Sequence, residues 1–190
     1  MFKTEQKGST MLEALAAISV VTVLGLSVVS LIGKMFDMFK QNVIEDEIKE
    51  IHKLITQRYR LEAVYSELDE LTVEDFDKEK LVPSQMISGN KLLHKLNDEV
   101  TIKTSALGDD FFDVKFEGLP NRTCINLALI NWNANQTSDL YQIKIGEKVF
   151  KLPIPSNNVS FGDDNALPMN VVKANGACSG NDNTIIWTFQ

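Results

Sequence analysis

Three kinds of side chain in this sequence have a type and position that suggest chemistry: a carboxylate beside an apolar run, two cysteines and two histidines. Glu13 directly precedes residues 14–32, a stretch of 19 residues without a charge. A carboxylate at the centre of a membrane-spanning helix costs roughly 2.5 to 3.5 kcal/mol, and less near the interface. Glu13 therefore needs a partner, which is either a lipid headgroup or Lys7 at the interface, or a positive charge on another chain.

Cys124 and Cys178 are the only cysteines, and their spacing excludes a CxxC metal or redox site. A single disulfide is the simplest use of the two in an oxidising compartment, and two buried free thiols are the alternative. A bridge would close a loop of about 55 residues, which the loop-entropy model equates with roughly 4 kcal/mol of stability.

No set of side chains predicts catalysis. His52 and His94, the only histidines, have no cysteine or acidic cluster at ligand spacing. Nucleotide-binding, metalloprotease and serine-hydrolase motifs do not occur. Two acidic clusters lack the EF-hand spacing and are interpreted as solvated turns: Asp109, Asp110 and Asp113, and Asp163 and Asp164. We therefore expect no enzymatic activity, no cofactor and no metal site.

The composition indicates a folded domain with an additional segment. The chain has 190 residues, of which 44% are hydrophobic, enough for one packed core. Its net charge of −7 and its scattered lysines and arginines argue against nucleic-acid binding, which requires clustered basic residues.

Residues 14–32 predict a membrane-spanning helix, because 19 residues at 1.5 Å each nearly cover a bilayer core of about 30 Å. Lys3 and Lys7 precede this run, which predicts a cytoplasmic N-terminus and a C-terminal domain on the other side. A cleavable secretory signal is the alternative, but no A-x-A site follows the apolar run.

Residues 8–13, with the sequence GSTMLE, follow a short charged leader and precede the apolar run. This arrangement resembles the processing site of type IV prepilins and the related pseudopilins. The resemblance implies cleavage after Gly8, N-methylation of Ser9, and a glutamate, Glu13, as the fifth residue of the mature chain. It also implies an assembly role for Glu13, which would pair with the methylated amino terminus of a neighbouring subunit.

The resemblance further implies the partners and the location. A type IVb-like major pilin would be a homopolymer served by a prepilin peptidase, an inner-membrane assembly platform with an ATPase, and an outer-membrane secretin. It would lie in the bacterial inner membrane as a precursor and then form an extracellular filament. In pilins a C-terminal disulfide bounds an exposed variable region, and the segment from Cys124 to Cys178 is similar in spacing.

The residue pattern predicts an α+β fold in which one long helix packs on an antiparallel sheet. The expected domains are a leader at 1–8, an apolar helix at 9–33, its amphipathic continuation at 34–64, and an α+β head at 65–190. Apolar residues recur at helical spacing in the second half of the helix: Ile44, Ile48, Ile51, Ile55 and Tyr59. The charged residues between them, Glu47 included, are interpreted as a solvated face.

The head is expected to contain short elements. Residues 65–81 predict an acidic surface connection with one helical turn, and helices are predicted at 83–97, 123–132 and 166–174. Strands are predicted at 100–104, 112–116 and 184–189, and a hairpin at 141–152. Residues 156–165 are expected to form a loop.

Two other hypotheses remain open. Within the same family the chain would be a minor pilin or a pseudopilin of a secretion system. From a different class it would be a membrane-anchored periplasmic binding module that never polymerises, which predicts an uncut N-terminus.

Overall fold

The computed structural model describes residues 35, 42–62, 64–132, 139–153, 160 and 163–190, and the described residues from 42 onwards belong to one unit. The predicted leader at 1–8 and the predicted apolar helix at 9–33 therefore lie outside the described residues, as do residues 34, 36–41 and 63 of the predicted continuation. Within the described part of the chain, no helix combines the length and apolarity needed to cross a membrane.

The helix over residues 42–59 carries the predicted apolar stripe. Its stripe residues are almost fully buried, with exposed fractions of 0 to 2%: Ile44, Ile48, Ile51, Ile55 and Tyr59. The helix ends at residue 59, before the predicted end at 64, in a turn closed by a bond from the Glu62 amide to the Tyr59 carbonyl. Leu61, just beyond this end, is 96% exposed, so the buried stripe and the helix stop together.

The acidic connection contains two short helices, η1 (Ser66–Glu70) and α2 (Val73–Lys78). Thr72 and Asp75 form a capping box at the start of α2, in which each side chain accepts a hydrogen bond from the other residue's amide. Leu68 and Phe76 anchor the two helices in the core. The connection is therefore more ordered than the single helical turn predicted.

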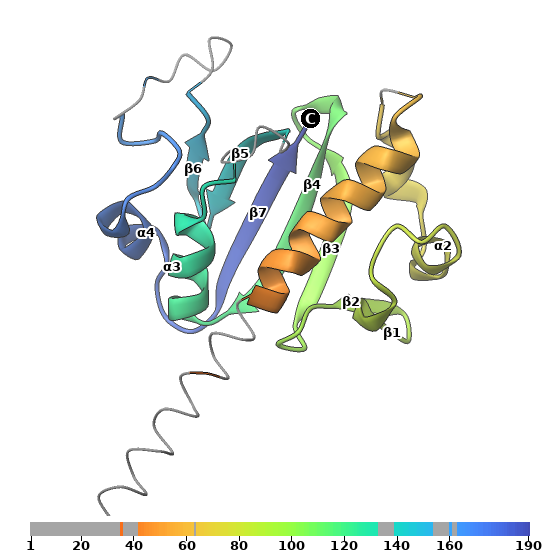
Figure 1. Ribbon diagram of the computed structural model, residues 1–190, viewed down its shortest axis with the longest axis horizontal. Coiled ribbons are helices and arrows are strands. Elements are labelled where there is room, and N and C mark those ends of the chain that lie inside the picture. The colour runs from red at the N-terminus through yellow and green to blue at the C-terminus, as the bar shows by residue number, and fades with distance from the viewer. Residues whose placement is uncertain (1–34, 36–41, 63, 133–138, 154–159, 161–162) are drawn as a thin grey trace, which may run out of the picture. The chain divides into compact units, whose positions relative to one another are not determined.

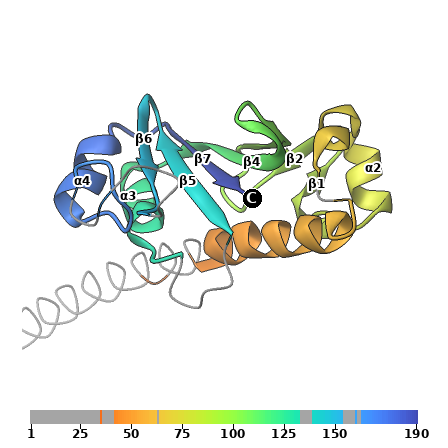
Figure 2. The same cartoon turned by 90° about the horizontal axis from the view of Figure 1, so that it is seen from above.

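A seven-stranded sheet, in which all neighbours pair antiparallel, forms the head (Figures 1 and 2). The strand order is β1-β2-β3-β4-β7-β5-β6, so the last strand of the chain lies between β4 and β5. The strands are β1 (Ile87–Ser88), β2 (Lys91–Leu93), β3 (Glu99–Ser105), β4 (Gly108–Leu119), β5 (Leu140–Ile145), β6 (Lys148–Lys151) and β7 (Asn183–Phe189). The predicted strands and the predicted hairpin are confirmed.

The helix predicted at 83–97 is wrong. The segment holds a 3-10 turn, η2 (Ser84–Met86), followed by the hairpin of β1 and β2. Ser88 pairs with Lys91 across a turn in which Gly89 has a φ of 60°, a left-handed conformation that glycine adopts without strain. The apolar residues that suggested a helical face thus belong to a turn and two short strands.

The two helices near the cysteines are displaced from their predicted positions. α3 (Asn121–Leu129) begins directly after Pro120, where the proline suits a helix start, and ends before Trp132. α4 (Val171–Ala177) begins later than predicted because Asn170 caps it, with Oδ1 accepting from the Lys173 amide at 2.9 Å.

Helix 42–59 and α3 cover the same face of the sheet (Figures 1 and 2). That face contributes large buried side chains to the core: Phe112, Val114, Phe116, Trp187 and Phe189. The His52 ring packs from the helix against Phe189, with ring centroids 4.5 Å apart. The core therefore fixes the position of the helix relative to the central strands.

Candidate functional site: the disulfide-bounded region

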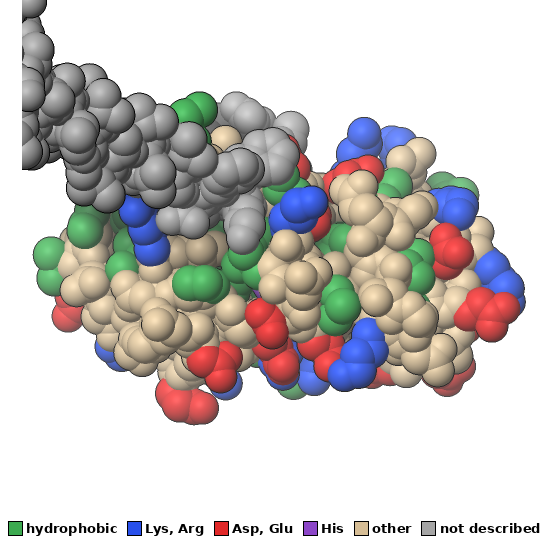
Figure 3. Space-filling view, turned by 90° about the horizontal axis from the view of Figure 1, so that it is seen from below, with side chains coloured by type: hydrophobic (Ala, Val, Ile, Leu, Met, Phe, Trp, Pro, Cys, Tyr) green, Lys and Arg blue, Asp and Glu red, His purple; other side chains and the backbone are tan. Residues whose placement is uncertain are grey.

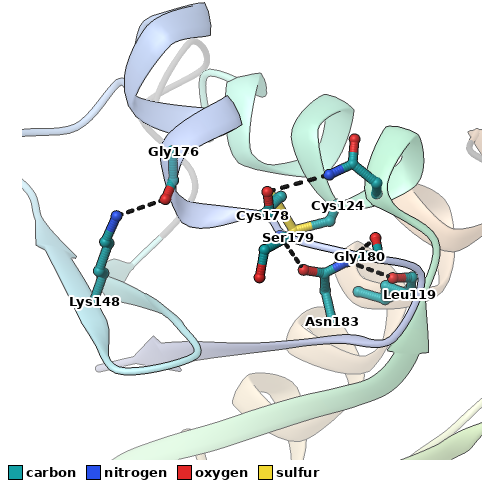
Figure 4. The surroundings of a disulfide bond; sticks show 9 residues. Leu119, Cys124, Lys148, Gly176, Cys178, Ser179, Gly180 and Asn183 are labelled. Atoms are coloured by element: carbon teal, nitrogen blue, oxygen red, sulfur yellow. Dashed lines mark hydrogen bonds between the residues drawn. A yellow bond between two sulfur atoms is a disulfide. The ribbon is translucent and has the colours of Figure 1, made fainter.

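A disulfide joins Cys124 of α3 to Cys178, the residue that follows α4, as predicted (Figure 4). The two Cα atoms are 5.9 Å apart, and both cysteines are buried, with exposed fractions of 0 and 2%. The bridge ties together helices of nine and seven residues, which are too short to be stable on their own. Residues 125–177 form the loop that it closes, called here the disulfide-bounded region.

Asn183, at the start of β7, holds the turn after the disulfide. Its Oδ1 accepts from the Ser179 amide at 2.7 Å, and its Nδ2 donates to the carbonyls of Leu119 at 2.9 Å and Gly180 at 3.2 Å (Figure 4). The side chain is 6% exposed, so these bonds are shielded from water. One amide thus links the end of β4, the turn and β7.

Two further side chains fix the end of α4. Asn121 Nδ2 donates to the Cys178 carbonyl at 3.1 Å, and Lys148 Nζ donates to the Gly176 carbonyl (Figure 4). Both carbonyls belong to the last turn of the helix or its cap, where intrahelical donors are missing. The sheet edge and α3 therefore supply the hydrogen bonds that α4 cannot make itself.

The outer surface of the two helices is apolar and weakly basic. Val171 and Val172, in the first turn of α4, are 63% and 81% exposed. Arg122 and Lys173 are the charged residues of α3 and α4, and neither helix contains an acidic residue. In Figure 3, apolar side chains are visible at the end of the head where these helices lie, together with some acidic and basic ones.

Glu47 departs from the expectation that it lies on a solvated face. It is 3% exposed, and its Oε2 accepts from the Lys95 amide in the turn between β2 and β3, at 3.3 Å. Burial raises the pKa of the Glu47 carboxyl to about 7, against the opposing effects of the Lys95 amide and the Lys95 charge. Sequence periodicity missed this residue, because it neighbours the buried Ile48 on the edge of the apolar stripe.

His94 is buried in the same turn, with an exposed fraction of 2%. Its Nδ1 accepts from the Leu96 amide at 3.1 Å, so the ring hydrogen lies on Nε2, which donates to the Glu117 carbonyl at 2.7 Å. The ring stacks on Phe116, with centroids 5.2 Å apart. Burial lowers the pKa of His94, opposed by the Glu117 carbonyl and by the charge of Asp98.

The residues of the predicted processing site, Gly8, Ser9 and Glu13, lie outside the described residues. His52 and His94 have different structural roles. His52 packs on Phe189, and His94 links the turn between β2 and β3 to the Glu117 carbonyl. In the described part of the chain, no group of three or more His, Cys, Asp or Glu side chains gathers as a metal site would require. The predicted loop at 156–165 also lies mostly outside the described residues.

Comparisons with known proteins place the chain in a family. The family model described as PilS N terminal matches residues 41–190. TcpA, a type IV pilin from the Vibrio cholerae El Tor biotype, has a similar fold with a TM-score of 0.51 at 11% identity, over 80% of this chain and 99% of that chain. The type IV b pilin from Salmonella typhi has a TM-score of 0.48 at 12% identity, over 75% of this chain and 97% of that chain. A search of curated proteins finds no significant match.

The family match covers most of the chain, and the helix on an antiparallel sheet agrees with the pilin fold. Pilins of this kind are structural subunits and not enzymes, in agreement with the lack of a predicted catalytic set. The chain therefore belongs to the PilS N-terminal family and has the fold of a type IV pilin.

Proposed function

We propose that the chain is the major subunit of a type IVb-like pilus, which serves surface attachment, aggregation or conjugative mating contact. The observation that carries the proposal is the continuity between motif and fold. A processing motif at 8–13 and an uncharged run at 14–32 precede a helix over 42–59 whose stripe is buried against a pilin head. The family match over residues 41–190 supports the same assignment.

In this proposal the N-terminal segment acts twice. The prepilin peptidase cleaves after Gly8 and methylates Ser9, and the apolar helix holds the precursor in the inner membrane. An assembly platform with its ATPase then moves the subunit into a filament that leaves through an outer-membrane secretin. The apolar run leaves the lipid bilayer and packs against the apolar helices of neighbouring subunits.

Glu13 sets the register of the incoming subunit. Its carboxylate neutralises the methylated ammonium at Ser9 of a neighbour inside the apolar bundle. Removing one partner of a buried ion pair costs about 3 to 5 kcal/mol, because the other charge is left unpaired. The pair therefore selects the correct docking position even where it adds little net stability.

The first test is intact-mass analysis of material sheared from the surface of cells that express the full chain. We expect a chain that begins at N-methyl-Ser9, contains the Cys124–Cys178 disulfide and is the most abundant protein of the filaments. A low copy number beside another, abundant pilin would assign a minor pilin or pseudopilin. A chain that retains residues 1–8 in the membrane fraction would contradict polymerisation and favour an anchored periplasmic module.

The second test compares two glutamates. Glu13→Gln should abolish filaments and leave the processed subunit in the membrane, because the neighbour's ammonium lacks a counter-charge. Glu5→Gln is the matched control, since Glu5 belongs to the leader and is absent from the mature subunit. Normal filaments from Glu13→Gln would contradict the assembly role of this carboxylate.

A further inference from the structure

The turn between β2 and β3, residues 94–98, is held by two buried groups that can each gain or lose a proton. Glu47 reaches it from helix 42–59 and accepts from the Lys95 amide at 3.3 Å. His94 lies within it and joins it to β4 through the Glu117 carbonyl at 2.7 Å. The two groups thus connect the helix, the turn and the central sheet.

The closed turn favours the neutral form of both groups. Glu47 is 3% exposed and accepts one hydrogen bond among the described residues, from the Lys95 amide, so its ionised form would be poorly solvated. His94 uses one ring nitrogen as acceptor and the other as donor, and protonation would remove the acceptor that serves the Leu96 amide. In weakly acidic solution the closed turn therefore holds a carboxylic acid and a neutral imidazole.

Few charged groups act on the pair within the described residues. Lys95 faces Glu47, and Asp98 acts on His94, each in the direction that favours the charged form. Burial outweighs both, because it raises the pKa of Glu47 and lowers the pKa of His94. Burial therefore shifts the two pKa values in opposite directions.

Release of the turn would return both groups to water. Glu47 would then lose its proton, since the ordinary pKa of its carboxyl is 4.5, and His94 would gain one below its ordinary pKa of 6.5. We propose that opening of the 94–98 turn moves one proton from Glu47 to His94 with no net exchange with solvent. The carboxylic acid becomes a carboxylate and the imidazole becomes an imidazolium, so protons and charge balance.

The consequence is a helix–turn contact whose strength does not depend on pH between about 4.5 and 6.5. Glu47 alone would make opening more favourable as pH rises, because the open state binds fewer protons than the closed state. His94 alone would make opening more favourable as pH falls, because the open state binds more. The two slopes have opposite signs and cancel in this range.

The test is hydrogen exchange at the Lys95 and Leu96 amides of the full chain in detergent micelles, at pH 5.0, 5.75 and 6.5, corrected for intrinsic exchange. We expect the opening constant of the unmodified chain to change less than about threefold over this range. His94→Gln should make it rise about tenfold per pH unit, and Glu47→Gln should make it fall as pH rises. The double variant should again show no pH dependence.

Glu50→Gln is the matched control, because Glu50 is an exposed glutamate of the same helix. In this variant the opening constant of the turn should remain nearly independent of pH, as in the unmodified chain. A tenfold change per pH unit in the unmodified chain, or single variants without opposite slopes, would overturn the proposal.

If His94→Gln does not fold, a second measurement tests the protonation of Glu47 in the closed turn. The ¹³C shift of the Glu47 side-chain carboxyl is followed against pH in the unmodified chain. A carboxyl that stays protonated past pH 6 supports the exchange of a proton with His94. A carboxyl that titrates near 4.5 overturns it, whatever the function of the filament.

Discussion

Helix 42–59 is attached to the head in one way, and α3 and α4 are attached in another. Helix 42–59 packs on the sheet through a continuous stripe of buried apolar side chains. α3 and α4 are shorter, expose apolar residues such as Val172, and are fixed by one disulfide and by side-chain hydrogen bonds to the end of α4.

The difference follows from how much surface each element can bury. The helix buries four isoleucines and a tyrosine, each worth about 1.5 to 3 kcal/mol when fully buried. α4 buries one of its seven residues, Ala174, and so relies on covalent and polar links. A region attached through such links can vary in sequence at its exposed positions without losing its attachment.

Loss of the disulfide should have the largest effect. The double variant Cys124→Ser with Cys178→Ser should lower the free energy of unfolding by about 4 kcal/mol, because a long loop is no longer closed in the unfolded chain. Urea denaturation of the full chain in micelles measures the loss. Hydrogen exchange should rise in α3 and α4 more than in helix 42–59, and a uniform rise would contradict the difference between the two kinds of attachment.

A cavity beneath helix 42–59 should cause the second-largest loss in the free energy of unfolding. Ile51→Ala should cost about 3 kcal/mol, since Ile51 is fully buried and the space cannot be refilled. Lys53→Ala, at an exposed position of the same helix, should cost less than about 0.5 kcal/mol. Equal losses in the two variants, measured in urea, would show that the apolar stripe does not anchor the helix.

Loss of the hydrogen bonds of Asn183 should cause the third-largest loss in the free energy of unfolding. Asn183→Ala should cost about 2 kcal/mol, because the buried Leu119 carbonyl and the Ser179 amide lose their partner. The exposed Asn175→Ala in α4 serves as control and should be nearly neutral. Amide exchange at Ser179 should accelerate only in the first variant, and an unchanged rate would contradict the assigned bond.

The capping box at α2 should have the smallest effect. Thr72→Ala should cost about 1 kcal/mol, because it removes the acceptor for the Asp75 amide. Ser66→Ala is the comparison, since Ser66 is exposed in η1, which has no side-chain cap. Thermal unfolding should separate the two variants, and a larger loss for Ser66→Ala would contradict the assignment.

The sequence predicted the elements whose pattern is regular and missed those that depend on distant contacts. The isoleucine stripe, the hairpin of β5 and β6 and the final strand have clear periodicity, and each was predicted. The β1–β2 hairpin failed because strands of two and three residues are too short to show alternation, although Gly89 marked the turn. A Thr-x-x-Asp sequence at Thr72 was a readable signal for α2.

Predicting the site had a similar limit. The disulfide between Cys124 and Cys178 could be predicted because the sequence contains only these two cysteines. The roles of Asn183 and Glu47 depend on carbonyls and amides of segments 64 and 48 residues away, which no local pattern reports. Buried polar residues are thus where sequence reasoning is weakest in this fold.

The place of β7 determines when the head can be completed. It follows the other described strands in sequence, yet it pairs with both β4 and β5 and lies between the two parts of the sheet. Residues 183–189 follow the other six strands in sequence, so the two parts of the sheet stay unjoined until this segment has been made. A chain cut short by even one strand would leave two unpaired sheet edges, which mark it for proteolysis before it can compete with intact subunits.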